Sequence, residues 1–218
     1  MRIGIVGAGM TVPWFLEAAK LIPEMEVRAL YVRKEEKRQE LCEKYQVPVA
    51  YDSYEKLLAD ASIDVLYLPV PNHLHYSFAK QALDAGKHVI LEKPFTVTYA
   101  EAKELARAKG LILFEAITNQ YNPNYDKVRE LLPGVGDVKI VQLNYSQYSS
   151  RYEAFKQGQI APVFDPKKAG GALMDLNVYN IHFVAGLFGE PKAVRYYPNM
   201  EKGVDTSGIL VMEYPTFQ

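Results

Sequence analysis

The first half of the chain alternates short apolar runs with amphipathic stretches. Apolar runs of strand length occupy residues 2–6, 27–32, 64–68, 88–91 and 111–116. Between these runs the apolar positions follow a helical period, as in the charged stretch 34–45, where Leu41 and Tyr45 are four positions apart. Strands that alternate with helices form right-handed crossovers, which build a parallel sheet covered by helices on both faces. The pattern predicts an α/β fold that begins with a doubly wound, Rossmann-type parallel sheet.

After about Asn119 the pattern changes. Residues 123–132 predict a helix, and residues 170–189 predict a second, more apolar helix. Residues 138–150 alternate apolar and polar side chains over a longer run, which favours an antiparallel strand with one solvated face. Further strands are predicted at the end of the chain, at residues 193–198 and 208–214. We therefore expect a dinucleotide-binding domain over residues 1–120 and an α+β domain with a mostly antiparallel open sheet over residues 121–218.

Composition and charge narrow the classes of function. The 218 residues are 49% hydrophobic and carry a formal net charge of −1, so a globular protein with no general attraction to nucleic acid is expected. No apolar run reaches the ~20 residues that cross a bilayer, so no membrane partner is predicted. Cys42 is the single cysteine, which fits a reducing, cytoplasmic compartment. His73 and His75 are two positions apart without a nearby carboxylate or thiol, so no metal site is predicted.

A glycine pair lies between the first strand and the first helix. Gly7 and Gly9 would allow a tight turn and close approach of backbone to a pyrophosphate, which the helix N-terminus would then bind. Met10 and Thr11 follow in the same turn and are included in the predicted cofactor site. A turn that merely needs glycine is the alternative, and Val12 replaces the third glycine of the usual dinucleotide fingerprint.

Two basic residues follow the second strand, where a carboxylate usually holds the ribose of NAD. Arg33 and Lys34 could instead bind a 2′-phosphate, so NADP is favoured over NAD as the cofactor. The alternative is a solvated basic start to a helix that also contains Glu35 and Glu36.

The loops that follow the strands at 64–68 and 88–91 carry further candidates. Ligands of an open parallel sheet bind outside the carboxyl ends of its strands. Pro71, Asn72 and His75 follow the earlier strand and are predicted to contact the cofactor, although a histidine at the position of His75 is more often a first-turn helix residue than a catalyst. Lys93 follows the later strand, and a lysine held there could stabilise an alkoxide as hydride leaves. A surface lysine beside a turn proline is the alternative.

The helix predicted at 170–189 carries three polar side chains on one stripe. At 100° per residue, Asp175, Tyr179 and His182 fall within a narrow sector of a helix that is otherwise apolar. A catalytic group and a structural polar network both explain such a stripe. The preceding pair Gly170 and Gly171 permits close approach of backbone, and a ligand is one candidate for what approaches.

Together these segments resemble the Gfo/Idh/MocA family of NAD(P)-dependent oxidoreductases. The resemblance runs over essentially the whole chain and is carried by GAG at 7–9, DVLYLPVPNHLH at 64–75, EKP at 92–94 and GGALMDLNVYNIH at 170–182. The tyrosine at 179, four residues after Asp175, resembles the branch of dihydrodiol dehydrogenases and glucose–fructose oxidoreductase. Family members usually exceed three hundred residues, so the resemblance also implies an open sheet that is incomplete in this chain.

The resemblance assigns roles by position. It makes Lys93 and Tyr179 the catalytic proton-handling pair, and Asp175 a catalytic or substrate-site carboxylate. It adds Glu92 and Lys93 to the cofactor contacts, and Lys93, Gln120, Asp175, Tyr179 and His182 to the substrate contacts. Related sequences often carry arginine at the position of Gln120.

The resemblance also implies an activity. We expect hydride transfer between a nicotinamide and a carbon of a sugar, polyol or cyclic diol, in a chain that forms a homodimer or homotetramer if its second domain is complete. The alternative is a non-catalytic dinucleotide-binding sensor or regulatory protein, since some relatives regulate transcription.

Overall fold

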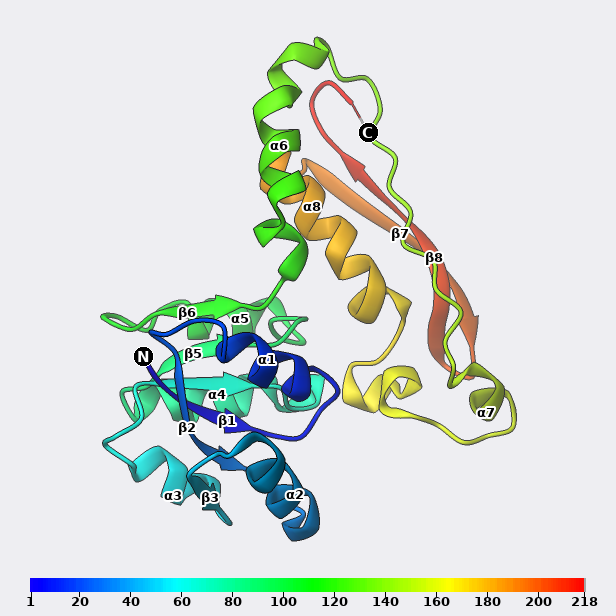
Figure 1. The fold of residues 1–218 in the computed structure, drawn as a ribbon. Coiled ribbons are helices and arrows are strands. Elements are labelled where there is room, and N and C mark those ends of the chain that lie inside the picture. The colour runs from blue at the N-terminus through cyan, green and yellow to red at the C-terminus, as the bar shows by residue number, and fades with distance from the viewer. Residues whose placement is uncertain (218) are drawn as a thin grey trace. The chain divides into compact units, whose positions relative to one another are not determined.

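The computed structural model describes residues 1–217, and its chain separates into two compact units, Met1–Ala116 and Ile117–Gln218 (Figure 1). Within the described residues, no helix has both the length and the apolar character that crossing a membrane requires. Each unit has a core and a topology of its own.

The first unit is built on a parallel sheet, as predicted. Within residues 1–217 the sheet has six strands in the order β3-β2-β1-β4-β5-β6. The strands are β1 (Arg2–Val6), β2 (Glu26–Tyr31), β3 (Val49–Tyr51), β4 (Val65–Leu68), β5 (His88–Leu91) and β6 (Leu113–Glu115). The strand order reverses between β1 and β4, and the carboxyl ends of both strands leave the sheet beside a single crevice.

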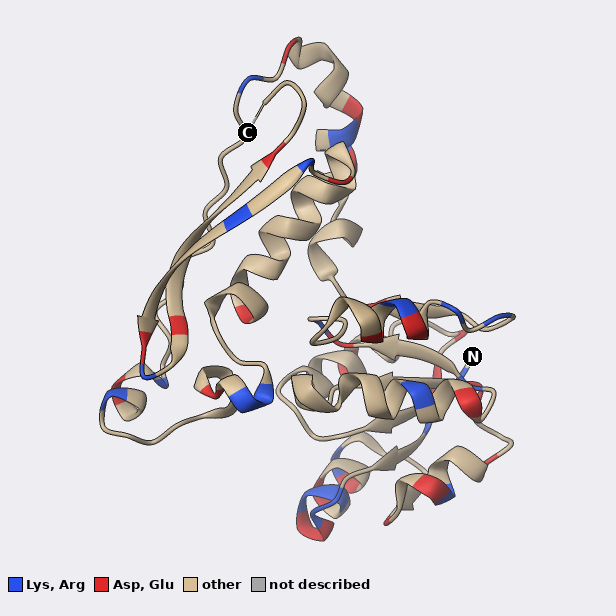
Figure 2. Ribbon diagram, turned by 180° about the vertical axis from the view of Figure 1, so that it is seen from behind, with Lys and Arg blue, Asp and Glu red and all other residues tan. Residues whose placement is uncertain are grey.

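Helices cover both faces of this sheet (Figure 1). They are α1 (Thr11–Ala19), α2 (Glu35–Tyr45), α3 (Tyr54–Ala59), α4 (His75–Asp84) and α5 (Tyr99–Leu105). Successive side chains of a strand point to opposite faces, so Ile5 packs with α1 and α2 whereas Val6 packs with α3, α4 and α5. Figure 2 shows that charged residues of both signs crowd α2, whose solvent-facing positions carry them.

The second unit contains helices and an antiparallel hairpin. Its main elements are α6 (Pro123–Leu131), α7 (Tyr152–Lys156), α8 (Val178–Phe188), β7 (Ala193–Glu201) and β8 (Val204–Glu213). In the described part of the chain, β7 and β8 pair only with each other. The strand predicted at 138–150 is not formed, and this segment has no regular secondary structure. Alternating side chains favour a strand only where a neighbouring strand supplies backbone partners, and the two strands present supply them to each other.

Tyr125 joins α6 to α8. Its side chain is 2% exposed, its ring lies edge-on to Phe183 with centroids 5.1 Å apart, and its hydroxyl donates to the Phe183 carbonyl at 3.3 Å. Gly186 lies where the Tyr125 hydroxyl approaches α8, and any Cβ at that position would collide with it. The two helices therefore pack around one buried phenol.

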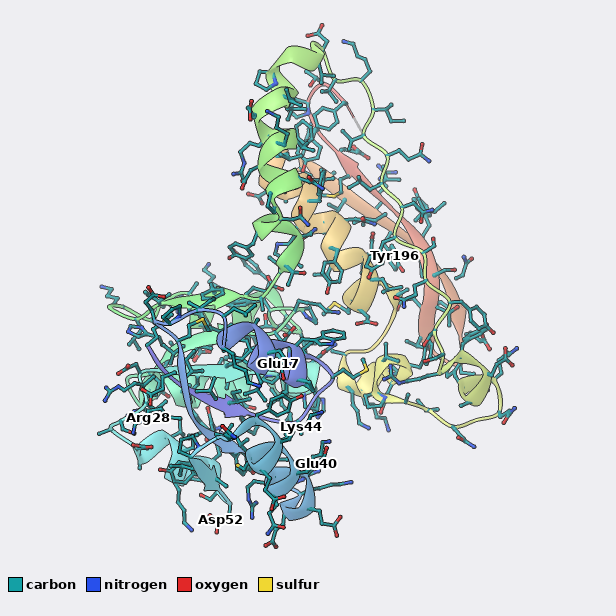
Figure 3. All side chains as sticks on the ribbon, viewed as in Figure 1. Glu17, Arg28, Glu40, Lys44, Asp52 and Tyr196 are labelled. Carbon is teal, nitrogen blue, oxygen red and sulfur yellow. The ribbon has the colours of Figure 1, made fainter. Side chains whose placement is uncertain are left out.

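Asp205 joins the hairpin to the start of the helix that contains α8. Its Oδ2 accepts hydrogen bonds from the Leu173 backbone N–H at 2.7 Å and from the Tyr196 hydroxyl at 2.6 Å. Tyr196 lies on β7 (Figure 3), and burial, with the bond to Asp205, raises its pKa. Gly171 has φ +126°, and a Cβ there would collide with the Asp205 carboxylate.

This packing predicts that Gly171→Ala destabilises the protein by about 2–4 kcal/mol, because the new methyl group meets Asp205 and the backbone angle suits only glycine. Urea denaturation followed by circular dichroism measures the loss. Gly134→Ala is the matched control, since no atom lies within 4 Å of its Cβ position, and it should change the free energy of unfolding by less than ~0.5 kcal/mol. Equal unfolding midpoints for the two variants would contradict the packing described here.

Candidate active site

A groove opens where the strand order of the first unit reverses. Its volume is about 420 Å³, and it lies beside the ends of β1, β2 and β4. Residues from four segments line it: Val6, Gly7, Ala8, Tyr31, Val32, Arg33, Lys34, Lys37, Val70, Pro71, Leu74 and Phe78. Of the residues predicted to contact a cofactor, the groove includes Gly7, Arg33, Lys34 and Pro71.

The turn after β1 needs its glycines. Gly7 has φ +119°, its N–H donates to the Tyr31 carbonyl at 2.8 Å, and a Cβ would lie 2.8 Å from the Pro69 carbonyl oxygen. A Cβ at Gly9 would lie 3.3 Å from the same oxygen. The absence of side chains keeps this turn tight against the β4 loop and leaves backbone accessible above the sheet.

A basic group forms the wall of the groove beyond β2. Arg33 and Lys34 were expected from the sequence, and Lys37, on the first turns of α2, joins them. The Lys37 ammonium pairs with Glu40 at 2.7 Å. The helical spacing of Lys34 and Lys37 was the signal that could have identified Lys37, because residues three apart share a helix face.

Other predicted cofactor residues lie outside the lining of this groove. Among the described residues that line it, Gly9, Met10, Thr11, Asn72, Glu92 and Lys93 do not appear. Met10 is exposed at the start of α1, and Asn72 begins a short 3₁₀ turn (Asn72–Leu74) that leads into α4. Their contact with a cofactor stays a prediction.

Glu92 is fixed by a buried tyrosine of β4. The Tyr67 hydroxyl donates to Glu92 Oε1 at 2.5 Å, and its ring stacks on Phe15 of α1 with centroids 4.1 Å apart. Since that hydroxyl has one proton, the Thr11 hydroxyl, 2.9 Å away, is left to donate to Tyr67. Burial, reinforced by the negative charge of Glu92, raises the pKa of Tyr67. The Glu92 side chain is therefore tied to the first residue of α1.

Lys93 lies two residues after the end of β5, at the edge of the sheet where β1 and β4 also end. It is half-buried, its backbone N–H donates to Glu92 Oε2 at 3.3 Å, and the Lys93–Pro94 peptide bond is cis. Its neighbour Pro94 is buried. The lysine therefore lies at the edge of the sheet where the carboxyl ends of its strands are found, and its contact with a ligand stays a prediction.

His75 is the first residue of α4 and is 0% exposed. Its Nδ1 lies 2.7 Å from the Pro94 carbonyl oxygen and its Nε2 lies 2.9 Å from the Val70 carbonyl oxygen. A ring enclosed in this way has no accessible atom for a cofactor, so the expected direct contact of His75 does not fit its position. Burial lowers the pKa of His75, against the opposing effect of the two carbonyls.

In the second unit, the candidate residues lie on one continuous helical segment. Asp175 belongs to a π-helical turn, Leu173–Asn177, whereas Tyr179 and His182 belong to α8. All three side chains are half-buried. A π-turn has more residues per turn than an α-helix. The 100° per residue assumed for the three polar side chains therefore applies from Tyr179 to His182, but not between Asp175 and Tyr179. The Tyr179 ring lies edge-on to Tyr145 with centroids 5.4 Å apart.

Asn119 and Gln120 hold α8 from the side. The Asn119 side-chain amide donates to the Tyr179 carbonyl at 2.7 Å, and that of Gln120 donates to the His182 carbonyl at 2.7 Å. Both bonds go to the backbone of residues predicted to bind substrate. In this unit Gln120 therefore supports the helix, and its amide nitrogen is engaged in doing so.

The glycine pair before the π-turn has a structural use. A Cβ at Gly170 would lie 2.6 Å from the carbonyl oxygens of Pro162 and Val163, and Gly171 faces Asp205. The sequence predicted that something approaches the backbone of this glycine pair closely, with a ligand as one candidate. In the structure, the approaching groups are two backbone carbonyls and the Asp205 carboxylate. Neither contact could be read from the sequence, because the partners lie several residues or a whole hairpin away.

Within residues 1–217, no group of three or more His, Cys, Asp and Glu side chains is arranged to hold a metal ion. The groove instead fits a dinucleotide. It has glycine backbone next to the α1 N-terminus, which suits a pyrophosphate, and three cations at its far wall.

Comparison with known families agrees with this geometry. The profile of the oxidoreductase family with an NAD-binding Rossmann fold matches residues 1–113, and that of the GFO/IDH/MocA C-terminal domain matches residues 125–216. The first unit is accordingly an NAD(P)-binding Rossmann domain.

Curated relatives align over the whole chain. The scyllo-inositol 2-dehydrogenase (NADP(+)) IolU of Bacillus subtilis is 34% identical over 100% of this chain and 68% of its own length. The trans-1,2-dihydrobenzene-1,2-diol dehydrogenase of Sus scrofa is 32% identical over 99% of this chain and 65% of its own length. The chain thus spans about two thirds of the length of these relatives.

Solved structures show the same fold. The oxidoreductase yvaA from Bacillus subtilis superposes with a TM-score of 0.80 at 24% identity, covering 99% of this chain and 61% of that one. GenD2 from gentamicin A biosynthesis, in complex with NAD, gives a TM-score of 0.82 at 21% identity, covering 99% and 62%. With its groove, its basic wall and both profiles matched, this chain belongs to the Gfo/Idh/MocA family of oxidoreductases.

Proposed function

We propose that the protein is an NADP-dependent oxidoreductase that transfers hydride between the nicotinamide and a ring carbon bearing a hydroxyl group. The observation that carries the proposal is the position of Lys93, which leaves β5 at the sheet edge where the cofactor groove opens. A cation at that edge has a use in the chemistry of a CH–OH carbon, because it can stabilise an alkoxide.

The substrate class is inferred from two relatives. One is named for scyllo-inositol and the other for trans-1,2-dihydrobenzene-1,2-diol. Both names describe a six-membered carbocycle with hydroxyl groups on adjacent carbons. We therefore propose an inositol or a similar cyclic diol as substrate, ahead of an open-chain polyol.

The proton is handled by residues of this chain. When bound, the nicotinamide supplies a hydride acceptor. As the C–H hydride leaves, the substrate hydroxyl gives its proton to the ionised Tyr179 side chain, and the Lys93 ammonium stabilises the developing alkoxide by a charge-assisted hydrogen bond. We propose Tyr179 as the second proton-handling group and Asp175 and His182 as substrate contacts, because the family resemblance places polar groups at these positions.

The preference for NADP is inferred from the basic wall of the groove. Arg33 is exposed there, and its planar guanidinium suits a phosphate group by two parallel hydrogen bonds. Lys34 and Lys37 add positive charge without that geometry. The relative named for NADP supports the same choice.

Self-association is proposed from the surface of the hairpin. On one face of the hairpin, the cross-strand partners Tyr197 and Ile209 are both large, apolar and exposed. An apolar strand surface of this kind is typical of a subunit interface, so we propose a homo-oligomer. We also propose a reducing, cytoplasmic compartment, because Cys42 is the single cysteine of the chain.

Replacing Lys93 by methionine is expected to lower kcat by at least ~100-fold, because the alkoxide loses its charged partner while the side chain keeps its approximate length. The rate of NADPH formation at 340 nm with scyllo-inositol or a cyclic diol measures turnover, and fluorescence titration measures the Kd for NADPH, which should change less than ~3-fold.

Lys109→Met is the control, since Lys109 is exposed after α5 and far along the chain from the groove residues. Turnover that survives in Lys93→Met would refute the catalytic role. Tight NADPH binding without turnover on any sugar, inositol or diol tested would favour the alternative function, a dinucleotide-binding sensor.

Replacing Arg33 by alanine is expected to raise the Kd for NADPH by about 10-fold or more, since a charge-assisted hydrogen bond contributes roughly 1.5–3 kcal/mol. The Kd for NADH should change less than ~2-fold, because NADH has no 2′-phosphate. Fluorescence titration measures both constants. Arg107→Ala, at an exposed position after α5, serves as control. Equal weakening of both cofactors would refute the assignment of Arg33 to the 2′-phosphate.

A further inference from the structure

His75 is enclosed between two loops of the first unit. It is fully buried, and each of its ring nitrogens faces a backbone carbonyl oxygen, that of Pro94 at 2.7 Å and that of Val70 at 2.9 Å. Packing alone does not explain a buried polar side chain at this position. An apolar residue would fill the same space without the free-energy cost of removing a polar ring from water. The question is which of the two loops needs it.

The two carbonyls belong to functionally different segments. Val70 lines the cofactor groove, whereas Pro94 follows Lys93 directly. On the other side of the lysine, Glu92 is tied to Tyr67 at 2.5 Å. The backbone of Lys93 therefore lies between two anchored neighbours, one fixed through its side chain and the other through its carbonyl.

The ring has one N–H for two acceptors. A carbonyl oxygen only accepts, and a neutral imidazole donates from a single nitrogen. Burial favours the neutral ring, while the charges of Glu92 and Glu115 act in the opposite direction. The shorter of the two contacts is that from Nδ1 to Pro94, so the geometry assigns the proton to Nδ1 and the donated bond to the loop that carries the lysine.

We propose that His75 is a positioning residue: its Nδ1–H holds the Pro94 carbonyl and thereby sets where the Lys93 ammonium lies relative to the cofactor groove. This inference rests on the proposed catalytic function of Lys93. It gives the histidine a part in the reaction although the ring touches neither substrate nor cofactor. A merely structural histidine would contribute to the stability of α4 and leave the lysine unaffected.

Two substitutions separate the two carbonyl contacts. The amide nitrogen of asparagine occupies roughly the place of Nδ1, and that of glutamine roughly the place of Nε2. His75→Asn therefore retains a donor for Pro94, and His75→Gln retains one for Val70. We expect kcat to be lower by at least ~10-fold in His75→Gln than in His75→Asn, with Kd values for NADPH within ~3-fold of each other. Unfolding midpoints of both variants show how much stability each change costs.

Equal values of kcat in the two variants, or a difference in kcat that merely follows the loss of stability, would overturn the proposal. If either variant does not fold, the unaltered protein decides the matter. The ¹⁵N chemical shifts of the His75 ring report which nitrogen carries the proton, and the proposal requires the Nδ1-protonated tautomer. Observation of the Nε2-protonated tautomer would overturn it.

This readout also separates the present inference from the proposed function. The tautomer is measured without substrate, so it stands or falls independently of turnover. If Lys93→Met keeps full activity, the catalytic role of Lys93 is refuted. The positioning role of His75, which depends on it, is then refuted as well. If Lys93→Met is inactive and the Nε2 tautomer is found, the function stands and the positioning role of His75 alone is refuted.

Discussion

The close approach between the end of β1 and the end of β4 is the constraint on which the first unit depends. Gly7 can lie against the Pro69 carbonyl only because it has no Cβ, and that contact brings the turn before α1 beside the loop before α4. Parallel pairing then places the end of β5 at the same edge. The cofactor groove, the hydrogen bond that holds Glu92 and the position of Lys93 therefore all depend on the same two features. These are the parallel direction of the strands and one turn that has no room for a side chain.

The sequence predicted the first unit well because each of its elements is locally encoded. Residues 2–6 were expected as a strand and form β1, and the helix expected at 34–45 forms α2. Buried parallel strands are nearly all apolar, and Ser53 and Thr98 cap α3 and α5 by accepting hydrogen bonds from the backbone of the first helical turn. β3 was missed, since a three-residue edge strand is too short to show a period.

The second unit shows where local reasoning fails. An alternating run at 138–150 has the pattern of a strand, but a strand also requires a partner that the run itself does not specify. The uses of Gly171 and Gln120 depend on Asp205 and on the backbone of α8, which lie tens of residues away. His75 was recognised as an early helical residue, and only the fold shows that both ring nitrogens face carbonyls. Candidate residues could be named from the sequence, whereas their hydrogen-bond partners could not.

The π-turn at Leu173–Asn177 has a consequence for how this site can change in evolution. Such a turn contains one residue more than the α-helical turn it replaces. Deleting one residue between Asp175 and Tyr179 would let the segment close as regular α-helix, and the two residues would then be three positions apart, which is still about one turn. The polar side chains would therefore keep to one side of the helix. A π-turn of this kind lets a helix accommodate one extra residue without turning its later side chains to another face.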